Sequence, residues 1–228
     1  MGRVSGQAGE DRLTETLWHE GRLAGAAWEP GRPVLWSVRL DSEAAAGALA
    51  RSPHDARDLA DFAAAPDAAY RLLRRRLTRA LLAQLAGVAP EDILFGRTGD
   101  GAPSVLSPAG WHVSVAGRAG HALIGLAERP IGVDAEPLDA APPLWDMLTA
   151  TEAERIEALA PSDRPRAWLR AWTAKEAHAK RWRFARHADP ASIETEIVAG
   201  DRLSAGSTEG TSLVFLREAN GRIEAAAL

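Results

Sequence analysis

The chain has 228 residues and no cysteine, which excludes disulfides, thiolate metal ligands and a cysteine nucleophile. Its 27 lysines and arginines against 31 aspartates and glutamates give a formal net charge of −4, so it has no general attraction for nucleic acids or acidic membranes, and any anion site must be local. The length suffices for one sizeable domain or two small ones.

Residues 1–30 mix glycine, glutamate and arginine without clear periodicity, and we expect a partly ordered lead-in without a functional role. This stretch has no apolar run typical of a signal peptide, and nowhere in the chain do about 18 apolar residues follow one another. We therefore expect a soluble, cytoplasmic protein.

The stretch 31–108 predicts an N-terminal subdomain of one strand followed by helices. Residues 33–40 are rich in β-branched and aromatic residues, which favours a strand. A polar N-cap predicts a short helix over 41–50, and the Ser-Pro pair that begins 52–62 is typical of an N-cap followed by proline in the first turn. Residues 67–86 carry leucines at helical spacing and precede a glycine, which predicts the longest helix of this half.

This longest helix carries a dense group of arginines, Arg71, Arg74, Arg75, Arg76 and Arg79. The simplest interpretation is a solvated face opposite the leucines. Arg71, Arg75 and Arg79 nevertheless share one helical face, so two of them could bind one phosphate. The glycine-rich stretch 95–105 that follows is predicted as a connector; it lacks the Walker spacing and the terminal Lys-Ser/Thr pair, so it is not a P-loop.

Residues 109–228 predict a C-terminal subdomain. It begins with three short β-like runs, which predict a small antiparallel meander over 112–117, 122–128 and 130–136. Residues 142–148 are expected to form one or two helical turns.

The remaining elements of this half are two helices and a hairpin. Thr151 with Glu154 predicts a capping box for a helix that ends at Ala160. A long helix follows over 164–183, and the last 18 residues alternate around an Asn-Gly turn, which is a strong hairpin signal. Both halves thus contain strands and helices in a similar order, which predicts an α+β fold of two similar α/β subdomains.

The segment AWTAKEAHAKR, residues 171–181, places Trp172, Glu176 and Lys180 on one helical face at i, i+4 and i+8. By itself this spacing indicates a solvated ion pair that contributes about 0.2–0.5 kcal/mol. Upstream, in IGVDAEP, Asp134 and Glu136 project from the same side of an extended segment. Three carboxylates from two elements can converge on a hard divalent cation.

The two motifs together resemble the signature of the 4′-phosphopantetheinyl transferase superfamily, (I/V)-G-(I/V)-D-x-E followed after about forty residues by (F/W)-(S/T/C)-x-K-E-(A/S)-x-x-K. The chain matches every fixed position, with Gly132, Asp134, Glu136, Trp172, Lys175, Glu176, Ala177 and Lys180. Length and element order are similar to the larger members, in which one chain supplies two pseudo-twofold related halves. The resemblance covers roughly residues 33–228 and implies that fold.

The resemblance implies a reaction in which phosphopantetheine passes from coenzyme A to a serine of an acyl or peptidyl carrier protein of fatty acid, polyketide or nonribosomal peptide biosynthesis, leaving 3′,5′-ADP. Asp134, Glu136 and Glu176 would hold Mg²⁺. Glu176, or water held by the metal, would take the proton of the serine hydroxyl. Lys175 and Lys180 would neutralise the phosphates and assist the leaving group, whereas Trp172 is expected to pack.

The coenzyme-binding positions depart from the family pattern. Where Ser-His is common the chain has Ser114-Val115, and where Gly-Lys-Pro is usual it has Ala102 in place of lysine. Near Ser52, where basic residues are common, three aspartates stand instead, Asp55, Asp58 and Asp61.

Each lost charge-assisted contact should weaken binding of the coenzyme's 3′-phosphate by about 1.5–3 kcal/mol. We expect Ser114, Lys175, Lys180 and Arg71 to bind the coenzyme, with Arg118 or His121 as further compensating cations. For His121 itself, a surface position on a hairpin is the favoured interpretation.

Three further hypotheses follow from these departures. A close variant uses a donor without the 3′-phosphate, such as dephospho-coenzyme A. A rival of another class is a carrier-protein binding module that has lost efficient transfer. A nucleic-acid binder is disfavoured, because the net charge is negative and no aromatic platform is interleaved with the arginines. Single-chain members of the family can act alone, which favours a monomer.

Overall fold

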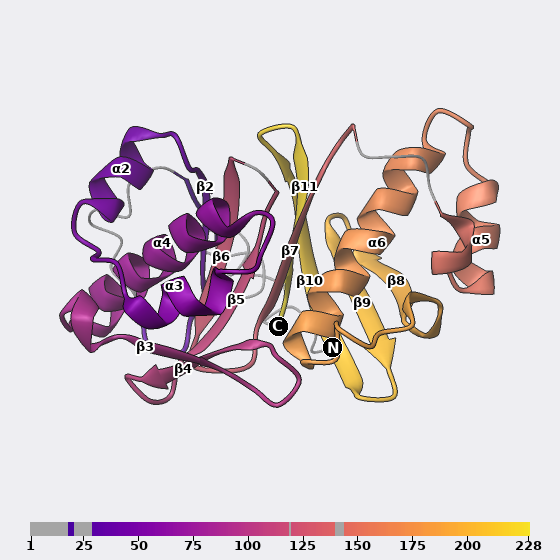
Figure 1. Cartoon of the computed structure of the whole chain (residues 1–228). Helices are drawn as coiled ribbons and strands as arrows, with labels where there is room; N and C mark the ends of the chain where they lie inside the picture. The colour runs from indigo at the N-terminus through magenta and orange to yellow at the C-terminus, as the bar shows by residue number, and fades with distance from the viewer. Residues whose placement is uncertain (1–17, 21–28, 119, 140–143) are drawn as a thin grey trace, which may run out of the picture.

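The computed structural model describes residues 18–20, 29–118, 120–139 and 144–228. Its α-helices and β-strands form two halves that lie side by side, each with one main sheet and one long helix (Figure 1). This arrangement confirms the predicted α+β fold class. Among the described residues, none of the helices has the length and apolar character that crossing a membrane requires. Residues 142 and 143, the start of the predicted helical turns at 142–148, lie outside the described ranges.

The N-terminal half contains β1 (Trp18–Glu20), β2 (Val34–Arg39), α2 (Glu43–Leu49), α3 (Ala56–Phe62), α4 (Ala68–Ala86), η1 (Pro90–Asp92), β3 (Leu94–Arg97), β4 (Pro103–Ser107), β5 (His112–Ala116) and β6 (His121–Ala127). Its main sheet has the order β1-β2-β6-β5, and β3 and β4 form a separate pair. The predicted strand at 33–40 and the long helix are confirmed, and Gly87 ends α4 in the left-handed conformation, with φ 66°.

The C-terminal half contains β7 (Gly132–Pro137), η2 (Trp145–Met147), α5 (Ala150–Glu157), α6 (Arg164–Arg181), η3 (Pro190–Ser192), β8 (Glu194–Ala199), β9 (Arg202–Ser207), β10 (Gly210–Ala219) and β11 (Arg222–Ala227). Its sheet has the order β7-β11-β10-β9-β8. The terminal hairpin is confirmed: Asn220 and Gly221 have φ of 55° and 70°, as a tight primed turn requires.

Several local predictions were wrong. The predicted meander is split between the sheets, because β5 and β6 pair with each other and β6 pairs with β2, whereas β7 pairs with β11. The change from one sheet to the other therefore falls between β6 and β7, beyond the boundary expected at 108/109. The connector at 95–105 is the β3–β4 hairpin, and the sequence signals for β8 and β9 were missed.

Two helix starts were also misplaced. The helix α3 is capped by Asp55, whose side chain accepts a hydrogen bond from the Arg57 amide at 2.7 Å, rather than by Ser52. The capping box of α5 is formed by Thr149 and Glu152, two residues before the predicted pair. In the folded chain Glu152 is also the partner of a buried lysine, an interaction that local sequence spacing does not reveal.

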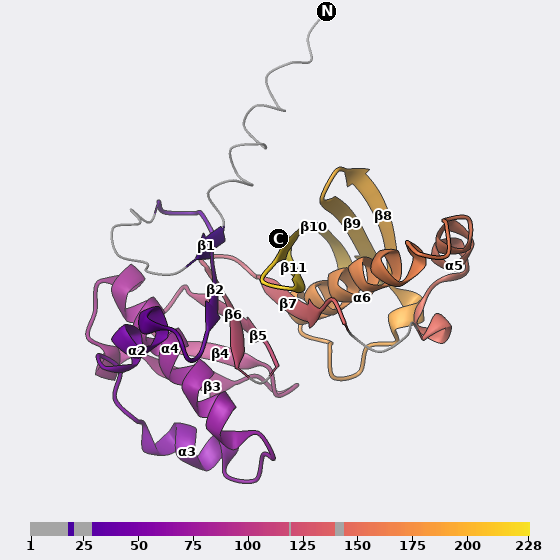
Figure 2. The same ribbon diagram turned by 90° about the horizontal axis from the view of Figure 1, so that it is seen from above.

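The layers follow from the alternation of strand side chains. On β2, Val34, Trp36 and Val38 pack in a core cluster with α4, whereas Leu35 belongs to a cluster between the two sheets. That cluster also contains Val133 of β7. A third cluster lies between α6 and the second sheet. The two sheets thus face each other, with α4 and α6 on the outside (Figures 1 and 2).

A buried polar network joins the halves between the sheets. Glu224 of β11 accepts hydrogen bonds from the Ser37 hydroxyl at 2.5 Å and from Arg217 Nε at 2.8 Å. His121 Nε2 lies 3.2 Å from the same carboxylate. Burial alone raises the pKa of Glu224, but the hydrogen bond from His121, the charge of Arg217 and the hydrogen bond from Ser37 outweigh it and hold the pKa below its usual value. His121 is therefore buried in this network, not at the surface as predicted.

We expect Glu224→Ala to lower the free energy of unfolding by about 3–5 kcal/mol, because Arg217 loses its carboxylate partner in a dry interface. Since the folded-state pKa of Glu224 is lowered, its contribution is present above the unfolded-state pKa and is lost as pH falls through the folded-state value. Urea unfolding should show a difference in free energy of unfolding between wild type and variant that becomes smaller as the pH is lowered into the acid range. A difference in free energy of unfolding that grows in acid would contradict this prediction. So would an equal loss of free energy of unfolding in the exposed control Glu196→Ala.

Candidate active site

The packing of β7 against α6 builds the candidate site. At Gly132 a Cβ atom would lie 1.9 Å from the Ala177 carbonyl oxygen and 2.4 Å from the Arg181 amide nitrogen. Only glycine therefore permits this close approach of strand to helix. On the same strand, Val133 and Ala135 point into the core between the sheets, so that Asp134 and Glu136 point the other way.

Asp134, Glu176 and Lys180 come together at this contact. Lys180 Nζ lies 2.5 Å from Asp134 Oδ1, whereas Asp134 Oδ2 is buried and has no hydrogen-bond partner. Burial raises the pKa of Glu176, the charges of Asp134 and Glu136 raise it further, and only Lys180 opposes the shift. The site thus holds more negative charge than its one ammonium neutralises.

Glu136 completes the group of carboxylates. Its pKa is raised by burial first and by Asp134 second, and Arg118, at 3.5 Å, opposes the shift. A hydrogen bond from Trp172 also stabilises the charged form. The Trp172 ring stacks on Trp168 with centroids 5.8 Å apart, so this tryptophan packs, as predicted, and also orients Glu136.

The chemistry of the donor set fits a hard divalent cation. As the side chains stand, no group of three or more histidine, aspartate or glutamate residues in the described ranges is arranged to hold a metal ion. The reason is visible at Asp134, where the Lys180 ammonium occupies one oxygen while the other is buried and unpartnered. Carboxylate oxygens are the ligand type that Mg²⁺ prefers, and the unpartnered Asp134 Oδ2 is such an acceptor.

Lys175 does not join this group. Its ammonium is buried, pairs with Glu152 at 2.5 Å and donates hydrogen bonds to the carbonyls of Met147 and Pro190 at 3.0 and 2.8 Å. One residue along a helix turns the side chain by about 100°, so neighbours of Glu176 face another direction. Lys175 therefore does not lie where a phosphate contact was expected. Its ammonium instead connects α6 to η2, η3 and α5.

Two adjoining clefts open at the site. The first has a volume of about 540 Å³ and is lined by both halves, including Ser114 of β5 and Arg181 of α6. The second, of about 440 Å³, includes Asp134 and Glu136. Arg71 and Lys180 line both clefts. The structure therefore brings the predicted residues Arg71, Ser114 and Lys180 to one hollow beside the carboxylates.

Ser114 and Arg71 each already have a partner within the protein. The Ser114 hydroxyl accepts a hydrogen bond from the Val133 amide at 3.0 Å and so holds β5 against β7. Arg71 is exposed and pairs with Asp67 at 2.5 Å. A bound phosphate would compete with Asp67 for this guanidinium, whereas Ser114 retains its hydroxyl hydrogen for a ligand in the cleft.

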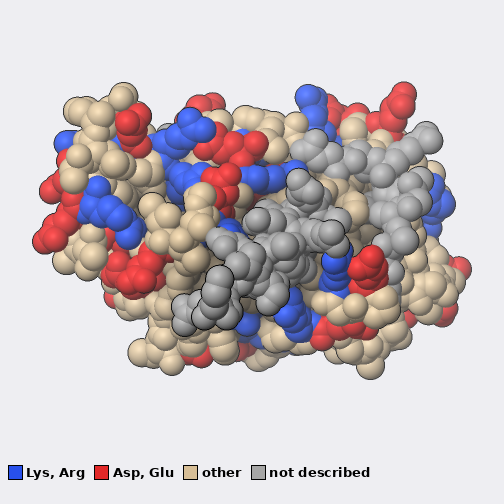
Figure 3. All heavy atoms as spheres, turned by 180° about the vertical axis from the view of Figure 1, so that it is seen from behind, with Lys and Arg blue, Asp and Glu red and all other residues tan. Residues whose placement is uncertain are grey.

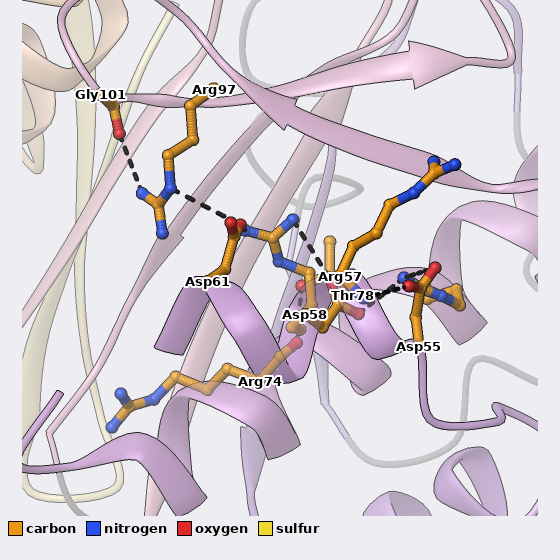
Figure 4. A network of polar contacts seen from close by, with 10 residues as sticks. Asp55, Arg57, Asp58, Asp61, Arg74, Thr78, Arg97 and Gly101 are labelled. Carbon is orange, nitrogen blue, oxygen red and sulfur yellow. Dashed lines mark hydrogen bonds and ion pairs between the residues drawn. The ribbon is translucent and has the colours of Figure 1, made fainter. Parts of the chain in front are cut away.

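The aspartates of α3 neutralise the arginines of α4. Arg79 donates to Asp58 at 2.6 Å, and Arg75 lies 3.7 Å from the same carboxylate and 4.0 Å from Asp61. Arg75 and Arg79 are buried. They do not form the solvated face considered from the sequence, and of the two Arg75 lines the second cleft beside Arg71. The aspartates are therefore partners of local arginines rather than free charges that would repel a phosphate (Figure 4).

Sequence reasoning missed four cations that line the first cleft, Arg97, Arg181, Arg183 and Arg186. A signal was present, because KRWRFAR at 180–186 is a basic run directly after the second motif. The local pattern of this basic run does not show that residues 183–186 approach the β3–β4 hairpin in the fold.

A known family model matches the part of the chain that contains both motifs. Residues 130–222, which include β7 and α6, match the model of the 4′-phosphopantetheinyl transferase superfamily. A search among curated proteins found no match to the chain. The family match spans both motifs on which the resemblance was based and confirms it. Over residues 130–222 the chain is therefore similar to the 4′-phosphopantetheinyl transferase superfamily, a superfamily of transferases.

Proposed function

We propose that the protein transfers the 4′-phosphopantetheine group from coenzyme A to a serine of an acyl or peptidyl carrier protein in a Mg²⁺-dependent reaction. One observation carries the proposal: Asp134 and Glu136 of β7 meet Glu176 and Lys180 of α6 beside a cleft large enough for a nucleotide. Similarity to the family over the same residues supports it.

The proposed chemistry breaks one phosphorus–oxygen bond of the coenzyme's pyrophosphate. The serine oxygen of the carrier forms the new bond to phosphorus, and 3′,5′-ADP leaves. Glu176, whose pKa is raised by burial, takes the serine proton. Lys180 neutralises charge on the pyrophosphate oxygens.

Asp134, Glu136 and Glu176 would hold the metal ion. When bound, Mg²⁺ would supply Lewis-acid stabilisation of the phosphate oxygens. Lys180, which pairs with Asp134 in the structure, is the cation that would face the phosphates. We assign Lys175 a positioning role, since its ammonium is held by Glu152 on another side of α6.

The test is to mix purified protein, Mg²⁺ and coenzyme A with a panel of apo acyl and peptidyl carrier proteins and to measure each carrier's mass. We expect at least one carrier to gain the mass of the phosphopantetheine arm, and the same carrier with its acceptor serine changed to alanine to gain none. Chelation of Mg²⁺ should stop the reaction. Binding of apo carriers without any mass gain would reject transfer and favour the rival binding module.

A further inference from the structure

We propose that Arg183 and Arg186, together with Arg97, form a binding site for the phosphomonoester at the nucleotide end of the donor. This inference rests on the proposed function and names how this chain recognises the 3′-phosphate despite the missing histidine and lysine. The site lies in the first cleft, where the segment after α6 meets the β3–β4 hairpin.

The first cleft has a strong local excess of positive charge. Six cationic side chains line it, namely Arg71, Arg97, Lys180, Arg181, Arg183 and Arg186, against the two carboxylates of Asp61 and Asp100. The formal excess of four positive charges stands in a protein of net charge −4. By contrast, acidic and basic side chains are interspersed on the face seen from behind (Figure 3). The charge is therefore concentrated at this cleft, where it can attract a multiply charged anion.

Arg183 and Arg186 differ from Arg71 and Arg97 in having no acidic partner among the described residues, and from Arg181, whose Nη1 donates hydrogen bonds to Thr211 and Ser212. Arg71 pairs with Asp67, and Arg97 lies 3.6 Å from Asp61. Among the described residues, neither Arg183 nor Arg186 forms an ion pair with a carboxylate; Arg183 contacts only the His112 ring, at 3.5 Å from Nη2 to Nδ1. Their guanidinium groups are thus available for a phosphate, which arginine binds in a bidentate manner.

The backbone after α6 turns so that the Arg186 guanidinium reaches the β3–β4 hairpin and the Arg183 guanidinium reaches His112 of β5. Arg183 has φ 65°, a left-handed conformation that is uncommon for a residue other than glycine and that turns the chain after α6. At the hairpin tip, Gly101 has φ 79°, and a Cβ atom there would lie 3.0 Å from Arg186 Nη1. Glycine thus leaves room for the Arg186 side chain beside the hairpin.

Arg97 supplies the third guanidinium and is held in place by its own hairpin. Its Nη1 donates a hydrogen bond to the Gly101 carbonyl at 3.0 Å, and its Nε faces Asp61 (Figure 4). The positive groups of two segments distant in sequence therefore surround the tip of one hairpin. Ala102, where the family usually has lysine, stands at the same tip.

The position within the cleft indicates which phosphate binds there. Asp134 and Glu136 line the second cleft and not the first, and Lys180 lies at the junction of both. The reacting pyrophosphate must lie near Lys180 and the carboxylates. An anion held by Arg183 and Arg186 lies beyond Lys180, which suits the second phosphate of the same donor, the 3′-phosphate of coenzyme A.

Calorimetric titration with coenzyme A and with dephospho-coenzyme A, each with Mg²⁺, tests this assignment. We expect the wild type to bind coenzyme A at least about tenfold more tightly, since two charge-assisted contacts are at stake. Arg183→Gln with Arg186→Gln should weaken coenzyme A binding by about tenfold to hundredfold and leave dephospho-coenzyme A binding nearly unchanged. Arg186→Gln alone, at an exposed position that should not affect folding, should show part of the same loss.

A matched control removes two arginines that do not line the cleft. Arg57→Gln with Arg166→Gln lowers the net charge equally at exposed positions and should leave both affinities unchanged. Equal wild-type affinities for the two donors, or an equal loss for both in the Arg183/Arg186 variant, would overturn the assignment. If the wild type then still modified a carrier, the proposed transferase function would stand and only this phosphate site would fail. Absence of both donor binding and carrier modification would reject the function itself.

Discussion

Glu176→Gln should reduce the rate of carrier modification by about 10²–10⁴-fold, because glutamine cannot accept the serine proton and donates no negative charge to a metal ion. The same change should not lower the melting temperature. Burial and the charges of Asp134 and Glu136 raise the pKa of Glu176, so the carboxylate form costs stability near neutral pH. A neutral side chain of equal size removes that cost.

Carrier modification under single-turnover conditions and thermal unfolding by circular dichroism measure the two effects on the same preparation. Glu154→Gln, an equivalent change at an exposed position of α5, is the matched control and should retain full activity. A Glu176→Gln variant that transfers at the wild-type rate would remove Glu176 from the proposed chemistry. Lost activity accompanied by lost stability would instead indicate that Glu176 supports the fold.

The second large effect is expected from Lys175→Ala, which should lower the free energy of unfolding by about 3–5 kcal/mol. The Glu152 carboxylate is fully buried, and its partner ammonium would be gone. The carbonyls of Met147 and Pro190 would also lose their donor. We expect the region around α5, η2 and η3 to loosen from α6.

Replacing both partners separates stability from chemistry. Lys175→Met with Glu152→Gln removes both charges and should recover much of the lost stability, since no buried ion remains unpaired. Urea unfolding measures the free energies, and the double variant should retain carrier modification. If Lys175→Ala were as stable as the wild type yet inactive, Lys175 would act on the phosphates, as the sequence motif by itself predicts.

Local sequence rules were sufficient for the elements that carry the site. Alternation in IGVDAEP correctly predicted that Asp134 and Glu136 share a side, because strand side chains alternate whatever the partner strand is. Helical spacing likewise predicted the long helix that carries Glu176 and Lys180. The Asn-Gly hairpin followed from the φ values that its turn requires.

Local sequence rules could not predict which residues distant in sequence become partners in the fold. Helical spacing does not show which of Lys175 and Lys180 enters the interior. Lys175 does so because Glu152, 23 positions earlier and part of the capping box of α5, is buried there as its partner. From the sequence, the aspartates near α3 were interpreted as replacing basic residues that would bind a phosphate; the structure shows that Asp58 pairs with Arg75 and Arg79.

The sequence by itself determined the fold class and the strand and helix of the two motifs, since these elements depend on the periodicity of neighbouring residues. The fixed positions of the two motifs carried the resemblance to the family. Only the tertiary structure decided the placement of β5 and β6, the inward position of Lys175, and the approach of Arg186 to the hairpin at Gly101. Those features depend on contacts between segments far apart in the chain, and such contacts are selected by packing and charge pairing in three dimensions rather than by local conformational preference.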